Sequence, residues 1–309
     1  LSACEKGRQW ERALRLMEEL RGARLTPDAI ACSAAISACE KGEQWEKALA
    51  NLAAMASQRI EKNTITYSAA ISASEKGGQW EIALHFLDLM VKDQVHRDTI
   101  VYNAVISACE KTQQWERALV LLFEMRASSE APTAITYSAA ISACEKGRQW
   151  EQAAEVFRMM CEHHLIPNMI TYCAMICACE TGEQWERALC FFCEMQERSI
   201  ERNDATYTAI ISACGKSNQW EMALEMLGEM RHTGLLCDTI TFDAVITAAS
   251  RAQEAGVALD LWGDMKRGRS APNEIMFGTA MSACSRLSDS ERILELMGEL
   301  RWEGMSRMR

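Results

Sequence analysis

Proline and long apolar runs are scarce in this sequence. Only four of its 309 residues are proline, whereas hydrophobic residues make up 49% of the chain. This apolar content suits a folded protein with a large core and excludes a disordered chain. No run reaches the roughly 18 apolar residues that a membrane-spanning helix needs, so we expect no membrane partner.

Basic residues are in deficit as well. Lysine and arginine number 33 against 43 acidic residues, which gives a formal net charge of −10. Because nucleic acid carries a dense negative charge, this balance at first argues against a nucleic-acid partner. The 14 cysteines favour a reducing compartment over a secreted disulfide scaffold, because they follow an internal repeat in a long chain.

The internal repeat has a period of 35 residues. Tryptophan recurs at this spacing, and glutamate follows every copy: Trp10, Trp45, Trp80, Trp115, Trp150, Trp185 and Trp220. The prolines share a single phase of the same period: Pro27, Pro132, Pro167 and Pro272. A fixed period of this size indicates an array of supersecondary units that stack on one another.

Residues 64–98, TITYSAAISASEKGGQWEIALHFLDLMVKDQVHRD, serve as an example of one repeat. Apolar residues from Ile65 to Ala73 have helical spacing, and Gly77 is expected to end this helix. A second helix with an i, i+3, i+4, i+7 apolar stripe is expected from Trp80. Such a hairpin is too small to bury its own stripe, so it must stack on its neighbours.

The sequence therefore predicts an all-α protein, an α-solenoid of 35-residue helix-turn-helix repeats. We expect residues 1–28 to be a truncated first repeat. The rest is expected to form eight repeats of one continuous solenoid: 29–63, 64–98, 99–133, 134–168, 169–203, 204–238, 239–273 and 274–308.

The repeat pattern TxTYSAAISACEKGxQWExAL, closed in places by Pro-Asp or Pro-Asn, resembles the pentatricopeptide repeat (PPR) of the P type. The resemblance covers the whole chain. It rests also on a tyrosine early in the first helix and a methionine late in the second: Tyr67, Tyr102, Tyr137, Tyr172 and Tyr207, and Met55, Met90, Met125, Met160, Met195, Met230 and Met265. Tryptophan at the start of the second helix, where the family often has leucine, is a mild departure.

The resemblance implies a right-handed superhelix that binds single-stranded RNA, about one nucleotide per repeat. It implies a role in organellar RNA processing, stabilisation or translation, in a chloroplast or mitochondrion. It also implies that the second residue of each repeat sandwiches a base, while the fifth and last residues read it. We expect no enzymatic activity in this segment; a catalytic domain outside it, such as a nuclease, stays open.

The second position is almost always isoleucine, with Ala205 as the exception. The base-sandwiching residues are expected to be Ile30, Ile65, Ile100, Ile135, Ile170, Ile240 and Ile275. From periodicity alone, an apolar residue at a helix start can equally serve to pack helix against helix, and that alternative stays open.

The last position is restricted to short hydrogen-bonding residues, except in repeat 274–308, which has Gly278 and Met308 and lacks reading residues. With the fifth position it forms the expected base-reading pairs: Ser33 and Asn63, Ser68 and Asp98, Asn103 and Thr133, Ser138 and Asn168, Cys173 and Asn203, Thr208 and Asp238, and Asp243 and Asn273. Ionised aspartate only accepts hydrogen bonds, whereas asparagine also donates, so aspartate should favour G or U and asparagine A or C. The alternative is that these residues cap turns and helix starts.

In the family, a small hydroxyl at the fifth position goes with purines and asparagine with pyrimidines. The resulting target, read 5′ to 3′ along the chain, is A-G-pyrimidine-A-any-G-any. The Cys173/Asn203 and Asp243/Asn273 pairs depart from the usual combinations, so their bases are left open.

A cation recurs at the end of the first helix in most repeats, although acidic residues outnumber basic residues in the whole chain. By resemblance these residues approach RNA phosphates: Lys41, Lys76, Lys111, Lys146, Lys216, Arg251 and Arg286. A local column can steer a ligand even when the net charge is negative. The alternative is a cation stabilised by the C-terminal end of the helix dipole.

Other chemistry is not indicated. Cys190 and Cys193 form a single CxxC without a second pair or a suitably spaced histidine pair, so we expect no metal and no cofactor. No nucleophile–base pair or phosphate-cradling glycine loop is present. The rival hypothesis is a peptide- or protein-binding scaffold of the tetratricopeptide type, for which an acidic surface would be natural. Such scaffolds vary their concave side chains without the restriction at the last position.

Overall fold

The computed structural model describes residues 1–23, 27–58, 60–128, 130–267, 274–287 and 296. Within these residues the chain is helical and contains no strand. The first helices of successive repeats are α1 (Ser2–Lys6), α3 (Ala29–Lys41), α5 (Thr64–Lys76), α7 (Thr99–Lys111), α9 (Ala134–Lys146), α11 (Met169–Thr181), α13 (Asp204–Lys216), α15 (Thr239–Arg251) and α17 (Glu274–Arg286).

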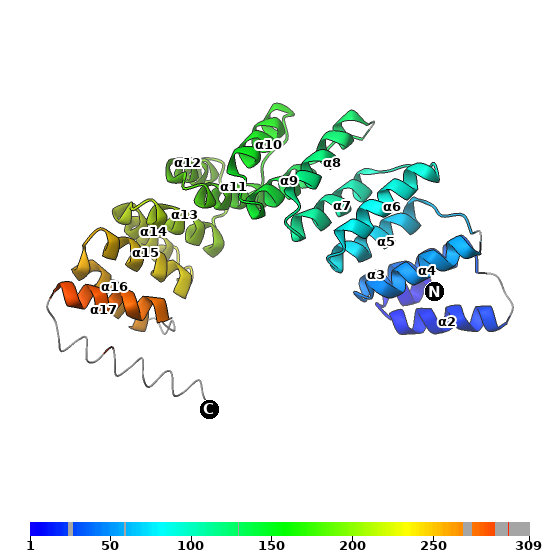
Figure 1. Cartoon of the computed structure of the whole chain (residues 1–309), viewed down its shortest axis with the longest axis horizontal. Helices are drawn as coiled ribbons and strands as arrows, with labels where there is room; N and C mark the ends of the chain where they lie inside the picture. The colour runs from blue at the N-terminus through cyan, green and yellow to red at the C-terminus, as the bar shows by residue number, and fades with distance from the viewer. Residues whose placement is uncertain (24–26, 59, 129, 268–273, 288–295, 297–309) are drawn as a thin grey trace. The chain divides into compact units, whose positions relative to one another are not determined.

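The second helices all begin where the tryptophan phase predicts. They are α2 (Trp10–Gly22), α4 (Trp45–Ser57), α6 (Trp80–Lys92), α8 (Trp115–Ala127), α10 (Trp150–Glu162), α12 (Trp185–Glu197), α14 (Trp220–His232) and α16 (Ala255–Arg267). The predicted all-α fold of helical hairpins is confirmed (Figure 1). No helix in the described ranges combines the length and the apolar character that crossing a membrane requires.

The chain divides into two compact units, Leu1–Pro167 and Asn168–Arg309. In the first unit, α3, α5, α7 and α9 contact one another in order, and in the second α11, α13, α15 and α17 do the same. Each of α4, α6, α8, α12 and α14 contacts the first helix of its own repeat and that of the next. Successive first helices therefore form a layer in which equivalent positions recur side by side. The continuity of a single solenoid through both units stays a prediction.

The core is built from side chains of constant phase. Its largest fully buried residues include the five tyrosines of the first helices and methionines near the ends of the second helices. The cysteines of the first helices, among them Cys39, Cys109 and Cys144, are also buried. Burial raises the pKa of Cys39 and Cys109 to about 11 and that of Cys144 to about 12, so these thiols stay protonated at neutral pH. The interpretation of the methionine and cysteine columns as core is confirmed.

Gly77 ends α5 as expected, as its C-cap, and it also has a packing role. Gly77 has φ −80°, which any residue can adopt, and the left-handed residue is the next one, Gly78, with φ 65°. A Cβ added at Gly77 would lie 2.6 Å from Cδ1 of Trp45. The absence of a side chain at Gly77 therefore lets the tryptophan of the preceding repeat pack against its backbone. Gly42 with Trp10 and Gly147 with Trp115 repeat this contact.

We predict that Gly77→Ala destabilises the chain by about 1–3 kcal/mol, because the new methyl group overlaps the Trp45 ring. Gly78→Asn is the matched control, since Asn218 has φ 61° at the equivalent position of another repeat. The free energy of unfolding, measured with urea, should fall for Gly77→Ala and stay near the parent value for Gly78→Asn. Equal stability of Gly77→Ala and the parent chain would contradict the packing role.

Candidate functional site

The last residue of each repeat caps the first helix of the next. The side chain of Asp28 accepts a hydrogen bond from the Ala31 N–H at 2.7 Å, and Asn63 accepts one from the Thr66 N–H at 2.9 Å. The same geometry recurs at Asp98, Thr133, Asn168, Asn203 and Asp238. The capping alternative is therefore realised in the structure. Because the cap occupies only one side-chain oxygen, an aspartate or asparagine keeps its second terminal atom for another partner.

The second-position isoleucines are exposed to solvent. The exposed fractions are 73% for Ile30, 64% for Ile65, 65% for Ile100, 66% for Ile135, 57% for Ile170 and 64% for Ile240. An isoleucine that packed one helix on another would lose most of this exposure, so the packing alternative does not fit. Each of these six first helices thus begins with an uncovered isoleucine two residues after a capping side chain.

The fifth-position side chains lie deeper. Ser33 and Ser138 are 7% and 5% exposed, while Ser68, Asn103, Cys173, Thr208 and Asp243 are half-buried. Three of them contact the threonine at the third position of the following repeat. Ser33 Oγ lies 3.0 Å from Thr66 Oγ1, Thr136 Oγ1 donates to Asn103 Oδ1 at 2.6 Å, and Thr208 Oγ1 lies 2.9 Å from Thr241 Oγ1.

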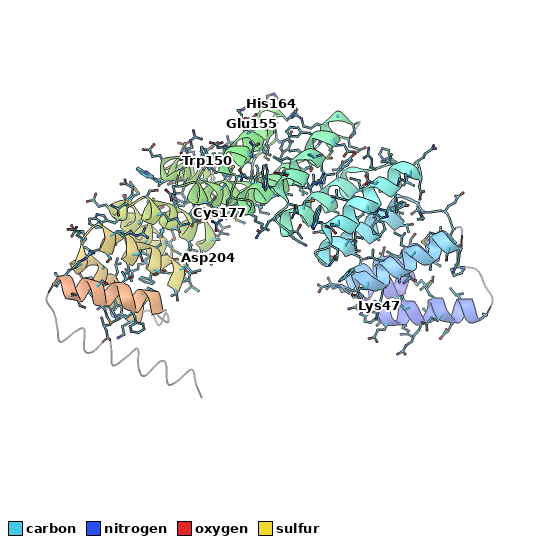
Figure 2. The ribbon with its side chains drawn as sticks, in the orientation of Figure 1. Lys47, Trp150, Glu155, His164, Cys177 and Asp204 are labelled. Atoms are coloured by element: carbon cyan, nitrogen blue, oxygen red, sulfur yellow. The ribbon has the colours of Figure 1, made fainter. Side chains whose placement is uncertain are left out.

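A cavity of about 560 Å³ joins these positions in the second compact unit. Thr208 and Asp238, the predicted reading pair of repeat 204–238, both line it, together with Ile240 and Ala205 of the second positions. Figure 2 labels two further lining residues, Cys177 on α11 and Asp204 on α13, on the same side of these helices. The structure therefore brings the reading pair and the sandwiching position of this repeat to one hollow.

The lysine column is ion-paired. Each lysine donates to a glutamate one repeat earlier in the chain: Lys41 to Glu5 at 2.9 Å, Lys76 to Glu40 at 2.8 Å, Lys111 to Glu75 at 3.0 Å, Lys146 to Glu110 at 2.8 Å and Lys216 to Glu180 at 2.9 Å. A serine hydroxyl joins two of these pairs, Ser107 at Glu75 and Ser212 at Glu180. The column is therefore charge-compensated rather than a bare cationic stripe.

The two arginines of the cation column do not show the lysine–glutamate pairing, and two other predicted site residues lie outside the described part of the chain. Arg251 is exposed, and the Arg286 guanidinium donates to the Ser250 carbonyl. Asn273 falls outside the described residues, as does the side chain of Ile275. In the parts of the chain that the structure covers, no group of three or more potential metal ligands is found.

Two sets of site residues were missed by the sequence analysis. The first set consists of the glutamates at the ends of the first helices, each of which binds the lysine of the following repeat. The third-position threonines, Thr66, Thr136 and Thr241, were not considered. The recurring threonine immediately before the aromatic residue of the first helix is the signal that could have identified them.

Comparison with known families agrees with the repeat pattern. The sequence model of the PPR repeat family matches residues 97–146, 132–181 and 203–251. The pentatricopeptide repeat domain matches residues 51–112, and the PPR repeat matches residues 170–200. The chain belongs to the pentatricopeptide repeat family. Comparison with curated proteins gives no match.

Solved structures show the same fold at low sequence identity. The pentatricopeptide repeat protein PPR10 bound to an 18-nucleotide PSAJ RNA element superposes with a TM-score of 0.74 at 17% identity, covering 96% of this chain and 43% of that one. PPR10 from maize gives 0.57 at 22% identity, over 98% and 48%. The PPR domain of Arabidopsis thaliana protein-only RNase P 1, in complex with tRNA, gives 0.52 at 13% identity, over 58% and 94%. The chain thus spans less than half the length of the PPR10 chains.

Proposed function

We propose that this chain binds single-stranded RNA base-selectively, about one nucleotide per repeat. The observation that carries the proposal is the column of isoleucines exposed by 57–73%. All of them except Ile135, which follows Thr133, lie beside a capping aspartate or asparagine that has a second terminal polar atom. Apolar side chains exposed at one phase of consecutive repeats favour a bound partner. A nucleobase suits such a site, because its flat face covers the isoleucine while its edge meets the polar atom.

The chemistry of the reading pairs supports base selection. In repeat 64–98, one Asp98 oxygen caps α7, and the other can accept from the ring N–H of guanine. In repeat 29–63, Asn63 Oδ1 caps α5, and Nδ2 can donate to the bare ring nitrogen of adenine. Together with the pairings that the family resemblance implies for the other repeats, these assignments give the proposed target A-G-pyrimidine-A-any-G-any. The PPR10 and RNase P relatives, which are described in complex with RNA, support the same partner.

The biological role in this proposal follows from the binding mode. Nucleotides held one per repeat are withheld from pairing and from nuclease attack, so binding protects or exposes a short stretch of a transcript. We propose a chloroplast or mitochondrial transcript, and the resemblance to P-type repeats supports this part of the proposal. The alternative function is that of a peptide-binding scaffold, which the net charge of −10 supports. Such a scaffold would require a basic peptide to cover the isoleucines.

The experiment that tests the function is selection from a pool of random single-stranded RNA. The parent chain should enrich the predicted string, and Asp98→Asn should move the second base from G toward A, because a donor replaces an acceptor. The first base, read by Ser33 and Asn63, is the internal control and should stay A. Enrichment of no motif, or an unchanged second base, would contradict the reading role of Asp98; retention of a basic peptide but not RNA would favour the scaffold.

The ion-paired lysines lead to a second prediction. In the variant Glu40→Gln, Glu75→Gln, Glu110→Gln, the amines of Lys76, Lys111 and Lys146 lose their carboxylate partners. RNA affinity at low salt should rise. The dependence of log K on log salt should steepen by up to about 2, since each phosphate neutralised on a single strand contributes about 0.7.

The matched control for this triple variant is Glu46→Gln, Glu81→Gln, Glu116→Gln. It changes the net charge equally, but at exposed positions on the second helices. Its salt dependence should remain close to that of the parent chain. Identical affinity and salt dependence of the two triple variants would show that the lysine column does not contact phosphate.

A further inference from the structure

One buried hydroxyl links the two reading side chains of a repeat. In repeat 29–63, Thr66 Oγ1 donates to Asn63 Oδ1 at 2.7 Å and lies in close contact, at 3.0 Å, with Ser33 Oγ, which donates to the Ala29 carbonyl at 2.7 Å. In repeat 204–238, Thr241 Oγ1 donates to Asp238 Oδ1 at 2.6 Å and lies 2.9 Å from Thr208 Oγ1. Thr66 and Thr241 are fully buried. Each is the third residue of the following repeat, and we call such a residue a bridging threonine.

The same bridge occurs where the reading pair differs. In repeat 99–133, Thr136 Oγ1 donates to Asn103 Oδ1 at 2.6 Å and lies 3.2 Å from Thr133 Oγ1. Thr136 is also fully buried. Because Asn103 Oδ1 is held by this hydroxyl, the amide nitrogen is the end left for a base.

A bridging threonine determines which end of an asparagine amide is available. Asn63 Oδ1 accepts from both the N–H and the O–H of Thr66, at 2.9 and 2.7 Å. Asn203 Oδ1 accepts the same two bonds from Thr206, at 3.0 and 2.6 Å. A flipped amide would place its NH₂ group against two donors and lose both bonds. The threonine therefore keeps Oδ1 inside the cap and leaves Nδ2 as the reading atom.

A carboxylate does not need this help, because its two oxygens are equivalent acceptors. The third position after Asp98 is Val101, and after Asp28 it is Ala31, so each of these caps receives only the backbone N–H. All three described asparagine caps have a threonine three residues later in the chain: Asn63, Asn168 and Asn203. Asp238 has a threonine too, and Asn273, outside the described residues, is followed by Met276.

We propose that the bridging threonine is a positioning residue for base selection: its hydroxyl fixes which atom of the neighbouring reading side chains faces the base. The proposal rests on the RNA-binding function above and adds a third residue to the reading pairs that have a bridging threonine. Base selection requires the threonine hydroxyl only in repeats whose reading side chain is an amide. Repeats that read with a carboxylate keep their selectivity without it.

The test compares Thr66→Val in two backgrounds. Beside Asn63, removal of the hydroxyl should lower the preference for A over G at the first nucleotide by about threefold to tenfold, the value of one neutral hydrogen bond. Thr66→Ser, which keeps a hydroxyl, should retain the preference. In the Asn63→Asp background, Thr66→Val should leave the preference for G unchanged. The G preference at the second nucleotide is the internal control for a folded, correctly bound chain.

A gain-of-function arm keeps the proposal testable should Thr66→Val fail to fold. Asp98→Asn places an amide beside Val101, and the double variant Asp98→Asn, Val101→Thr adds the missing hydroxyl. The double variant should prefer A over G at the second nucleotide about threefold to tenfold more strongly than the single variant. In the parent Asp98 background, Val101→Thr alone should leave the G preference unchanged.

The outcomes separate this inference from the function on which it rests. An A preference that survives Thr66→Val, or equal preferences of the single and double variants at residue 98, would overturn the bridging role while leaving RNA reading intact. An equal loss of preference in the parent and Asn63→Asp backgrounds would also overturn it, because the threonine would then be merely structural. A parent chain without base preference at any repeat would contradict the proposed function itself.

Discussion

The capping hydrogen bond between the last side chain of one repeat and the third N–H of the next is the interaction on which the rest of the structure depends. It starts each described first helix from α3 to α15 at the same residue of the repeat. That common start holds the second position exposed and the third position buried. A side chain that would otherwise be an ordinary N-cap thereby becomes a fixed polar group beside an exposed isoleucine.

Ion pairing of the lysine column limits how strongly the proposed RNA partner can bind through its phosphates. Each lysine of the column is held by a glutamate from the preceding repeat, so the surface beside the reading pairs is locally close to neutral. Affinity in this account comes mainly from stacking on isoleucine and from hydrogen bonds to base edges. Phosphate contacts contribute a smaller share of the binding free energy than they do in a basic nucleic-acid-binding protein. In such a protein, the release of counterions from the phosphates dominates binding.

Much of the fold could be predicted from the period, because tryptophan marks every second-helix start up to α14 and the apolar spacing is helical. The exposure of Ile65 could not, since a periodic apolar residue fits a packing role equally well. The partner of Lys111 lies 36 residues earlier in the chain at Glu75, and only the stacking of α5 on α7 brings the two together. Gly77 ends α5 as predicted, but its contact with the Trp45 ring could not be predicted, because the sequence does not show which ring packs against it. The role of Thr66 depends on hydrogen-bond geometry that no spacing rule contains.

The central claim is that one repeat reads one nucleotide, and removal of a whole repeat tests it most directly. Deletion of residues 99–133 joins Asp98 to Ala134, so α9 keeps an aspartate cap. RNA selection on the shortened chain should return the parent string without its pyrimidine, A-G-A-any-G-any, with the other bases unchanged. A string of unaltered length, or the loss of preference at every position in a chain that remains folded, would contradict the account.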